Sequence, residues 1–62
     1  GNGTMIALSA ASTEAVDKFH DTALKNGAID EGKPGKRSDG NYYGYIRDLD
    51  GNKITARYVI ND

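Results

Sequence analysis

The clearest periodic pattern in the sequence lies between Ser12 and Gly27. Side chains suited to a buried position recur there at intervals of three and four residues, which places them on one face of a helix; they are Val16, Phe19, His20, Ala23 and Leu24. The Ser12 hydroxyl can accept hydrogen bonds from the free N–H groups of a first turn, and Gly27 can take the left-handed conformation that ends a helix. The sequence therefore predicts one amphipathic helix between these two residues.

Four segments have the length and composition of strands. The short apolar run from Thr4 to Ser9 precedes the helix, and Ala28 to Glu31 can form a brief strand after it. Tyr42 to Arg47 and Lys53 to Ile60 are rich in β-branched and aromatic residues, and we interpret them as a β-hairpin. Asp50-Gly51 supplies the positive backbone angle of a tight turn between them, although a five-residue connection also allows a longer loop with a bulge.

A polar segment, residues 32–40, separates the second and third predicted strands. It has strong turn chemistry, because it contains Gly32, Pro34, Gly35, Ser38, Asp39 and Gly40. We therefore expect a loop here, and expect it to be the most mobile part of the chain.

The order strand, helix, strand, strand, strand predicts an α+β unit with one helix packed on an antiparallel-rich sheet. Because strand side chains alternate between the two sides of a sheet, the sheet has two different faces. The covered face should meet the helix and carries Ile6, Leu8, Ile46, Ile54, Ala56 and Tyr58. The open face has no cover within the chain and carries Met5, Ala7, Ser9, Tyr43, Tyr45, Arg47, Thr55, Arg57 and Val59.

Length and composition point to a small domain that needs a partner. A chain of 62 residues buries only about 60% of its unfolded surface, and this one has no cysteine for a disulfide. Eight Lys and Arg against nine Asp and Glu are interspersed, so nucleic acid is not expected as a partner. The longest apolar run, Met5 to Leu8, is far short of the ~20 residues of a membrane helix. We expect a cytoplasmic protein that does not bind membranes.

The first residues also bear on the extent of the natural product. The chain starts Gly1-Asn2-Gly3-Thr4, and its single methionine, Met5, falls inside the first predicted strand. We expect the natural product to begin upstream, and a tag remnant followed by a start at Met5 is the alternative.

Three segments, in this order, carry a family resemblance. They are Gly3-Thr4-Met5-Ile6-Ala7-Leu8, Ala15-Val16-Asp17-Lys18-Phe19-His20 and Tyr45-Ile46-Arg47-Asp48-Leu49-Asp50-Gly51-Asn52-Lys53-Ile54. Together they resemble a C-terminal βαβββ module of the glyoxalase/bleomycin-resistance/dioxygenase (vicinal oxygen chelate) superfamily. The most specific part is similar to the family's Asp-Pro-Asp-Gly-Asn hairpin, with Leu49 where proline is usual, and Pro34-Gly35 with Arg37 resembles a loop of many members.

The resemblance implies that residues 1–62 form a single module, the C-terminal half of a two-module protein. Such a module pairs with a second βαβββ module, either in a homodimer or in the N-terminal half of the same product. In metal-dependent members a histidine in the first strand and a glutamate in the last strand hold the metal ion. The corresponding positions here are Met5 and Thr55, a soft thioether and a neutral hydroxyl, which do not suit Mg²⁺, Mn²⁺ or Fe²⁺. We therefore expect no metal ligand and no cofactor in this half, and His20 belongs to the helix face that meets the sheet.

The resemblance also makes the open face one wall of a cup around a small organic ligand. The candidate ligand-binding residues of this cup are Met5, Ala7, Tyr43, Tyr45, Thr55 and Arg57. Arg57 is the best candidate for binding an anionic group, and a cross-strand ion pair is the alternative. The two tyrosines could equally be half-buried residues of an interface between modules. Asp48 and Asp50 most simply bind backbone N–H groups of the hairpin turn, and Lys33 to Arg37 belong to a solvated loop.

Three functions follow from these residues, and the sequence leaves them open. The first is a metal-independent, glyoxalase-like module that binds a small molecule and has no catalytic residue of its own. The second is an enzyme of lyase, dioxygenase or transferase type whose catalytic residues lie in a missing N-terminal half. The third is a pairing module without a ligand. No Ser/His/Asp, Cys/His or phosphate-loop motif supports a hydrolase or a kinase.

Overall fold

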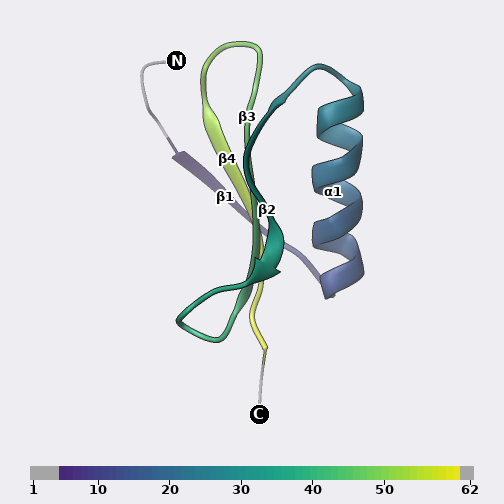
Figure 1. Ribbon diagram of the computed structural model, residues 1–62. Helices are drawn as coiled ribbons and strands as arrows, with labels where there is room; N and C mark the ends of the chain where they lie inside the picture. The colour runs from purple at the N-terminus through teal and green to yellow at the C-terminus, as the bar shows by residue number, and fades with distance from the viewer. Residues whose placement is uncertain (1–4, 61–62) are drawn as a thin grey trace.

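The fold is a four-stranded mixed sheet with one helix on one side (Figure 1). The computed structural model describes residues 5–60. The elements follow in the order β1 (Met5–Ser9), α1 (Thr13–Lys25), β2 (Ile29–Lys36), β3 (Tyr42–Arg47) and β4 (Lys53–Tyr58). The strand order is β1-β4-β3-β2, with β1 parallel to β4 and the other pairs antiparallel. This arrangement confirms the α+β class and the βαβββ order.

The helix begins and ends where its sequence signals predict. The Ser12 hydroxyl accepts a hydrogen bond from the Ala15 N–H at 3.1 Å, and the chain leaves the helix through Gly27 at φ +98°. The predicted apolar face turns toward the sheet, where Val16 is fully buried. A side chain at Gly44 of β3 would lie 3.2 Å from a Val16 methyl group, so the missing side chain lets helix and sheet approach closely. Val16, Ile46 and Ala56 form the small apolar core of the described residues.

The helix does not shield β1, and the expectation that it would cover Ile6 and Leu8 is wrong. α1 packs mainly against β2, β3 and β4. Ile6 and Leu8 stay 43% and 44% exposed, although Ile6 lies in register with Ile54 and Ile46 on the same face. A helix is about 10 Å wide with its side chains and strands are about 4.8 Å apart, so one helix covers about three strands. The fourth strand, β1, is left at the uncovered edge.

The second strand is longer than the sequence suggests. It runs from Ile29 to Lys36, whereas the sequence analysis predicts a strand only to Glu31 and a loop over residues 32–40. Its pairing with β3 is irregular, with register shifts on both sides of Gly32. Because β2 is an edge strand, Pro34 and the glycines are tolerated in it at bulges. The turn itself is confined to the segment after Lys36, where the Arg37 N–H donates to the Asn41 carbonyl at 2.9 Å.

The connection between β3 and β4 is the predicted turn. Gly51 has φ +86°, and the Asp48 carboxylate accepts hydrogen bonds from the N–H groups of Asn52 at 2.8 Å and Asp50 at 3.0 Å. The bond from the Asn52 backbone is the main reason why the pKa of Asp48 lies below its usual value. β3 has the predicted bounds, and β4 ends at Tyr58, so Val59 and Ile60 follow the strand. The predicted start at Thr4 lies outside the described residues.

Candidate functional site

The open face carries a hollow of about 510 Å³, a size typical of small-molecule sites. We call it the open-face hollow. It is lined by Met5, Ala7, Arg37, Ser38, Asp39, Tyr43, Tyr45, Thr55 and Arg57. All six residues that the sequence analysis names as candidate ligand-binding residues are among them, and their role in binding remains a prediction.

Sheet register explains why these side chains meet. Ala7 of β1 pairs with Thr55 of β4, and Thr55 pairs with Tyr45 of β3, so the three form one row across the sheet. Arg57 and Tyr43 pair in the next row on the same face. A strand exposes every second side chain to one face, so the period of two brings residues from three strands into one wall.

Two tyrosines in the wall of the open-face hollow stack on each other. The rings of Tyr43 and Tyr45 stack with centroids 5.9 Å apart and planes 9° from parallel. Two cations lie over the Tyr45 ring, the Arg37 guanidinium at 5.7 Å and the Lys53 ammonium at 5.3 Å from its centroid. Both distances are within the range of a cation–π interaction. The tyrosines are half-buried, so they offer an aromatic surface and leave part of it accessible.

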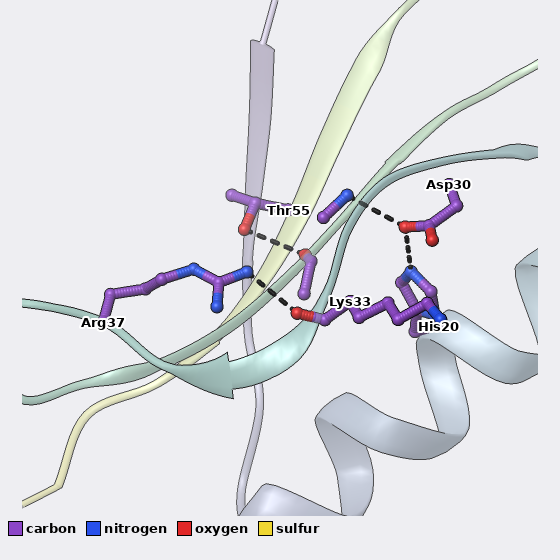
Figure 2. A network of polar contacts seen from close by, with 7 residues as sticks. His20, Asp30, Lys33, Arg37 and Thr55 are labelled. Atoms are coloured by element: carbon purple, nitrogen blue, oxygen red, sulfur yellow. Dashed lines mark hydrogen bonds and ion pairs between the residues drawn. The ribbon is translucent and has the colours of Figure 1, made fainter.

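Arg37 is the functional candidate that the sequence analysis misses. Its guanidinium donates a hydrogen bond to the Lys33 carbonyl at 2.8 Å, as Figure 2 shows. A side chain at Gly32 would approach the Arg37 guanidinium to 3.3 Å, and one at Gly35 would approach it to 3.2 Å. The two glycines therefore form a trough in which the Arg37 side chain lies. A strand in place of the expected loop turns this arginine from a solvated residue into part of the hollow.

Asp39 adds a carboxylate to the rim. It accepts a hydrogen bond from the Tyr43 hydroxyl and another from the Asn41 N–H at 2.9 Å. The Tyr43 hydroxyl is the main cause that lowers the pKa of Asp39, and the charge of nearby Arg57 lowers it further. Asp39 is thus held as a carboxylate at neutral pH, and it orients the Tyr43 ring. No feature of the sequence alone predicts this contact, because it depends on the geometry of the turn.

The two positions that correspond to metal ligands in the family do not fit a hard divalent cation. Thr55 is 2% exposed, and its hydroxyl donates to the Gly44 carbonyl at 3.1 Å. That oxygen is neutral and already serves the backbone. Met5 offers only a thioether, which is a soft ligand. Within residues 5–60, no three His, Cys, Asp or Glu side chains are grouped as metal ligands would be.

His20 lies on the other side of the sheet, under the helix. It is 5% exposed, and its Nε2 lies 3.1 Å from the Asp30 carboxylate (Figure 2). The same carboxylate oxygen accepts a hydrogen bond from the Gly32 N–H at 2.9 Å, which is the main cause of the lowered pKa of Asp30. His20 therefore fastens α1 to the first bulge of β2, and the sheet separates it from the hollow.

Known proteins similar to this chain were found among solved structures. No family model matches the sequence, and no curated protein matches it closely. Among solved structures, a glyoxalase/bleomycin resistance protein from Albidiferax ferrireducens is 43% identical, covers 97% of this chain and superposes with a TM-score of 0.86. A hypothetical protein from S. aureus is 28% identical over 94% of the chain, with a TM-score of 0.83.

A third solved structure shares the fold at lower identity. It is a glyoxalase/bleomycin resistance protein/dioxygenase family enzyme from Burkholderia phytofirmans, 23% identical over 97% of the chain, with a TM-score of 0.86. The chain spans 50%, 50% and 47% of the lengths of these three proteins. The class of protein is therefore a half-length βαβββ module. Its sequence and fold match one half of a glyoxalase/bleomycin resistance protein.

The structure also bears on membranes. Within the described part of the chain, α1 is the single helix, and its 13 residues are too few and too polar to cross a bilayer.

Proposed function

We propose that the chain is a metal-independent half of a two-module cup that binds a small organic molecule. The observation that carries this proposal is the open-face hollow on the face that the helix leaves uncovered. Its wall combines a stacked tyrosine pair, two arginines and Met5, and Lys53 lies over the Tyr45 ring beside it. A concave surface with aromatic and charged groups is the usual form of a small-molecule site. The half-length match to the solved structures supports a second module opposite this wall.

The edge strand β1 supports pairing as well. β1 is an outer strand of the sheet, and its Met5, Ile6 and Leu8 side chains are all between 43% and 56% exposed. An uncovered apolar edge strand is a ready surface for another chain. Covering even a few hundred Å² at ~25 cal/mol per Å² contributes several kcal/mol, comparable with the whole stability of so small a domain. The partner that we propose is a second copy in a homodimer or the N-terminal half of a longer product.

Two substitutions distinguish specific pairing through β1 from a general effect of removing exposed apolar surface. Ile6→Lys should convert a paired chain into a monomer in sedimentation equilibrium at micromolar concentration. Ile29→Lys is the matched control, because Ile29 is an exposed isoleucine of the opposite edge strand, β2. Both variants should keep the circular dichroism spectrum of the parent chain, which checks that they are folded. A folded parent chain that sediments as a monomer with freely exposed tyrosines would contradict the cup.

Metal independence is tested by elemental analysis. Because Met5 and Thr55 do not suit a hard cation, the purified chain should contain no stoichiometric divalent ion. One bound transition metal per chain at the open face would overturn this part of the proposal and favour an enzyme of the same family.

We place the protein in the cytoplasm, with which the absence of cysteine agrees.

Ligand binding itself is tested by NMR titration with a panel of neutral, anionic and cationic small molecules. Saturable shifts should appear at Ala7, Tyr43, Tyr45 and Arg57 and spare the helix. A panel that moves no resonance of the open face would refute the binding function.

A further inference from the structure

The cations of the open face outnumber its carboxylates. Arg37 and Arg57 line the open-face hollow, and Lys53 lies over Tyr45 beside them. Within residues 5–60, none of these three forms a salt bridge, whereas the neighbouring Arg47 pairs with Glu31 at 3.4 Å. Among the residues that the structure describes, Asp39 is the one carboxylate that lines the hollow. The wall is thus positive on a chain whose net charge is −1.

The contacts that fix the Arg37 side chain leave most of its N–H donors available to a ligand. A guanidinium has five N–H donors, and the Lys33 carbonyl accepts from one of them. The glycine trough at positions 32 and 35 and the Tyr45 ring fix the direction of the side chain. An arginine oriented in this way is suited to a carboxylate, which it binds through two parallel hydrogen bonds.

The surroundings of Arg37 define the rest of the ligand. Tyr43 and Tyr45 provide a stacked aromatic surface, and Met5, 56% exposed, provides a polarisable thioether at the β1 side of the hollow. Aromatic rings and thioethers both contact aromatic groups favourably. A free inorganic anion would leave this apolar surface wet, and a cation would meet three like charges.

We propose that the cup binds an aromatic carboxylate, with its acid group on Arg37 and Arg57 and its ring against the Tyr43–Tyr45 pair. The inference deepens the proposed function and rests on it. It makes Arg37 a binding residue and Gly32 and Gly35 positioning residues.

The experiment is an NMR titration of the full chain with benzoate, benzamide, benzylamine and inorganic phosphate. Benzamide keeps the shape of benzoate without its charge, benzylamine reverses the charge, and phosphate keeps a negative charge without the ring. Benzoate should bind at least tenfold more tightly than the other three probes, with shifts at Tyr43, Tyr45 and Arg57.

Three variants test the assignment to Arg37. Arg37→Gln should weaken benzoate binding at least tenfold and leave benzamide unchanged. Lys33→Gln is the matched control, because it removes the same charge from a side chain that runs toward the helix in Figure 2, and it should leave benzoate binding within twofold. Gly35→Ala keeps the charge and a permitted backbone angle but crowds the guanidinium, so it should weaken benzoate binding several-fold.

The outcomes distinguish this inference from the proposed function. If benzamide or benzylamine binds the hollow as tightly as benzoate, or if Arg37→Gln has no more effect than Lys33→Gln, the carboxylate assignment is wrong and a small-molecule cup remains. If phosphate binds as tightly as benzoate, the aromatic part is wrong. If no probe, nor any member of the wider panel, shifts the open face, both proposals are refuted.

Discussion

Replacement of Gly51 by valine tests the β3–β4 turn on which the register of the open face depends. Gly51 has φ +86°, a region that costs an L-residue about 1–2 kcal/mol and resists β-branched side chains most strongly. The substitution also restricts the unfolded chain, which offsets about 0.4–1 kcal/mol. Gly51→Val should therefore lower the free energy of unfolding by about 1 kcal/mol, out of roughly 3–9 kcal/mol for a domain of this size.

The backbone contacts of this turn have little freedom to relax. The Gly51 N–H donates to the Asp48 carbonyl at 3.0 Å, and the Gly51 carbonyl accepts from the Arg47 guanidinium at 2.6 Å. A rotation that relieves φ would break one or both of these bonds. The strain and the lost hydrogen bonds should therefore appear together as a lower thermal midpoint.

Thermal unfolding followed by circular dichroism measures the effect. A change of about 1 kcal/mol shifts the midpoint of so small a domain by about 4–8 °C. Gly51→Asn is the control, because asparagine tolerates the left-handed region, and its midpoint should fall by less than half as much. Equal midpoints for the parent, the valine and the asparagine variants would refute the turn geometry.

Three further substitutions address the core, the buried hydroxyl and the acid range. Val16→Ala removes two methyl groups from a fully buried site against β3 and should lower the free energy of unfolding by about 2 kcal/mol in urea; a loss under about 0.5 kcal/mol would mean that α1 does not seat there. Thr55→Val removes the hydrogen bond to the Gly44 carbonyl and should lower the free energy of unfolding by about 1 kcal/mol. An unchanged free energy of unfolding would indicate that the hydroxyl faces the hollow instead. Because the folded pKa of Asp48 lies below the ordinary 3.8, its carboxylate contributes stability above about pH 4 that is lost as pH falls through the folded pKa. Asp48→Asn should therefore flatten the loss of stability between pH 5 and pH 3, and parallel pH profiles would contradict the role of Asp48 in the turn.

The fold was predictable where short-range signals and tertiary packing agree. The helix has both of its end signals in Ser12 and Gly27, and β3 has an unbroken run of strand-forming residues, so both follow from local physics. The first residues of β2 were predicted as a strand, but its extension from Gly32 to Lys36 was not, because Gly32 and Pro34 have loop propensity and become strand only through pairing with β3. Local sequence does not contain that pairing.

The error about the cover of β1 has a geometric origin. Period-two alternation assigns Ile6 and Leu8 to the correct face but says nothing about how far across that face a helix reaches. The same alternation places Thr55 on the open face and does not show that its side chain is only 2% exposed there, in a row with Ala7 and Tyr45. The alternation within one strand gives the side of the sheet on which a side chain lies, whereas its burial depends on what packs across the whole sheet.

The candidate site divides in the same way. The residues on β1, β3 and β4 were accessible to sequence reasoning because they obey strand periodicity. Arg37 and Asp39 were not, because they reach the hollow from the β2–β3 turn. Two signals pointed to Arg37. One is the resemblance of Pro34-Gly35 with Arg37 to a loop of many family members, and the other is the spacing of Gly32 and Gly35 before it, which becomes informative once β2 is known to be a strand.

The position of β4 has a consequence for synthesis on the ribosome. β4 is the last strand in the chain, and it lies between β1 and β3, with Met5 paired to Lys53 and Tyr42 paired to Tyr58. A nascent chain can therefore form α1 and the β2–β3 hairpin early, while β1 lacks its neighbour in this sheet until β4 emerges. Contacts so distant in sequence form late in folding and expose apolar strands in the meantime. The exposed side chains of β1 are thus open to nascent-chain binding factors in the interval between the synthesis of β1 and that of β4.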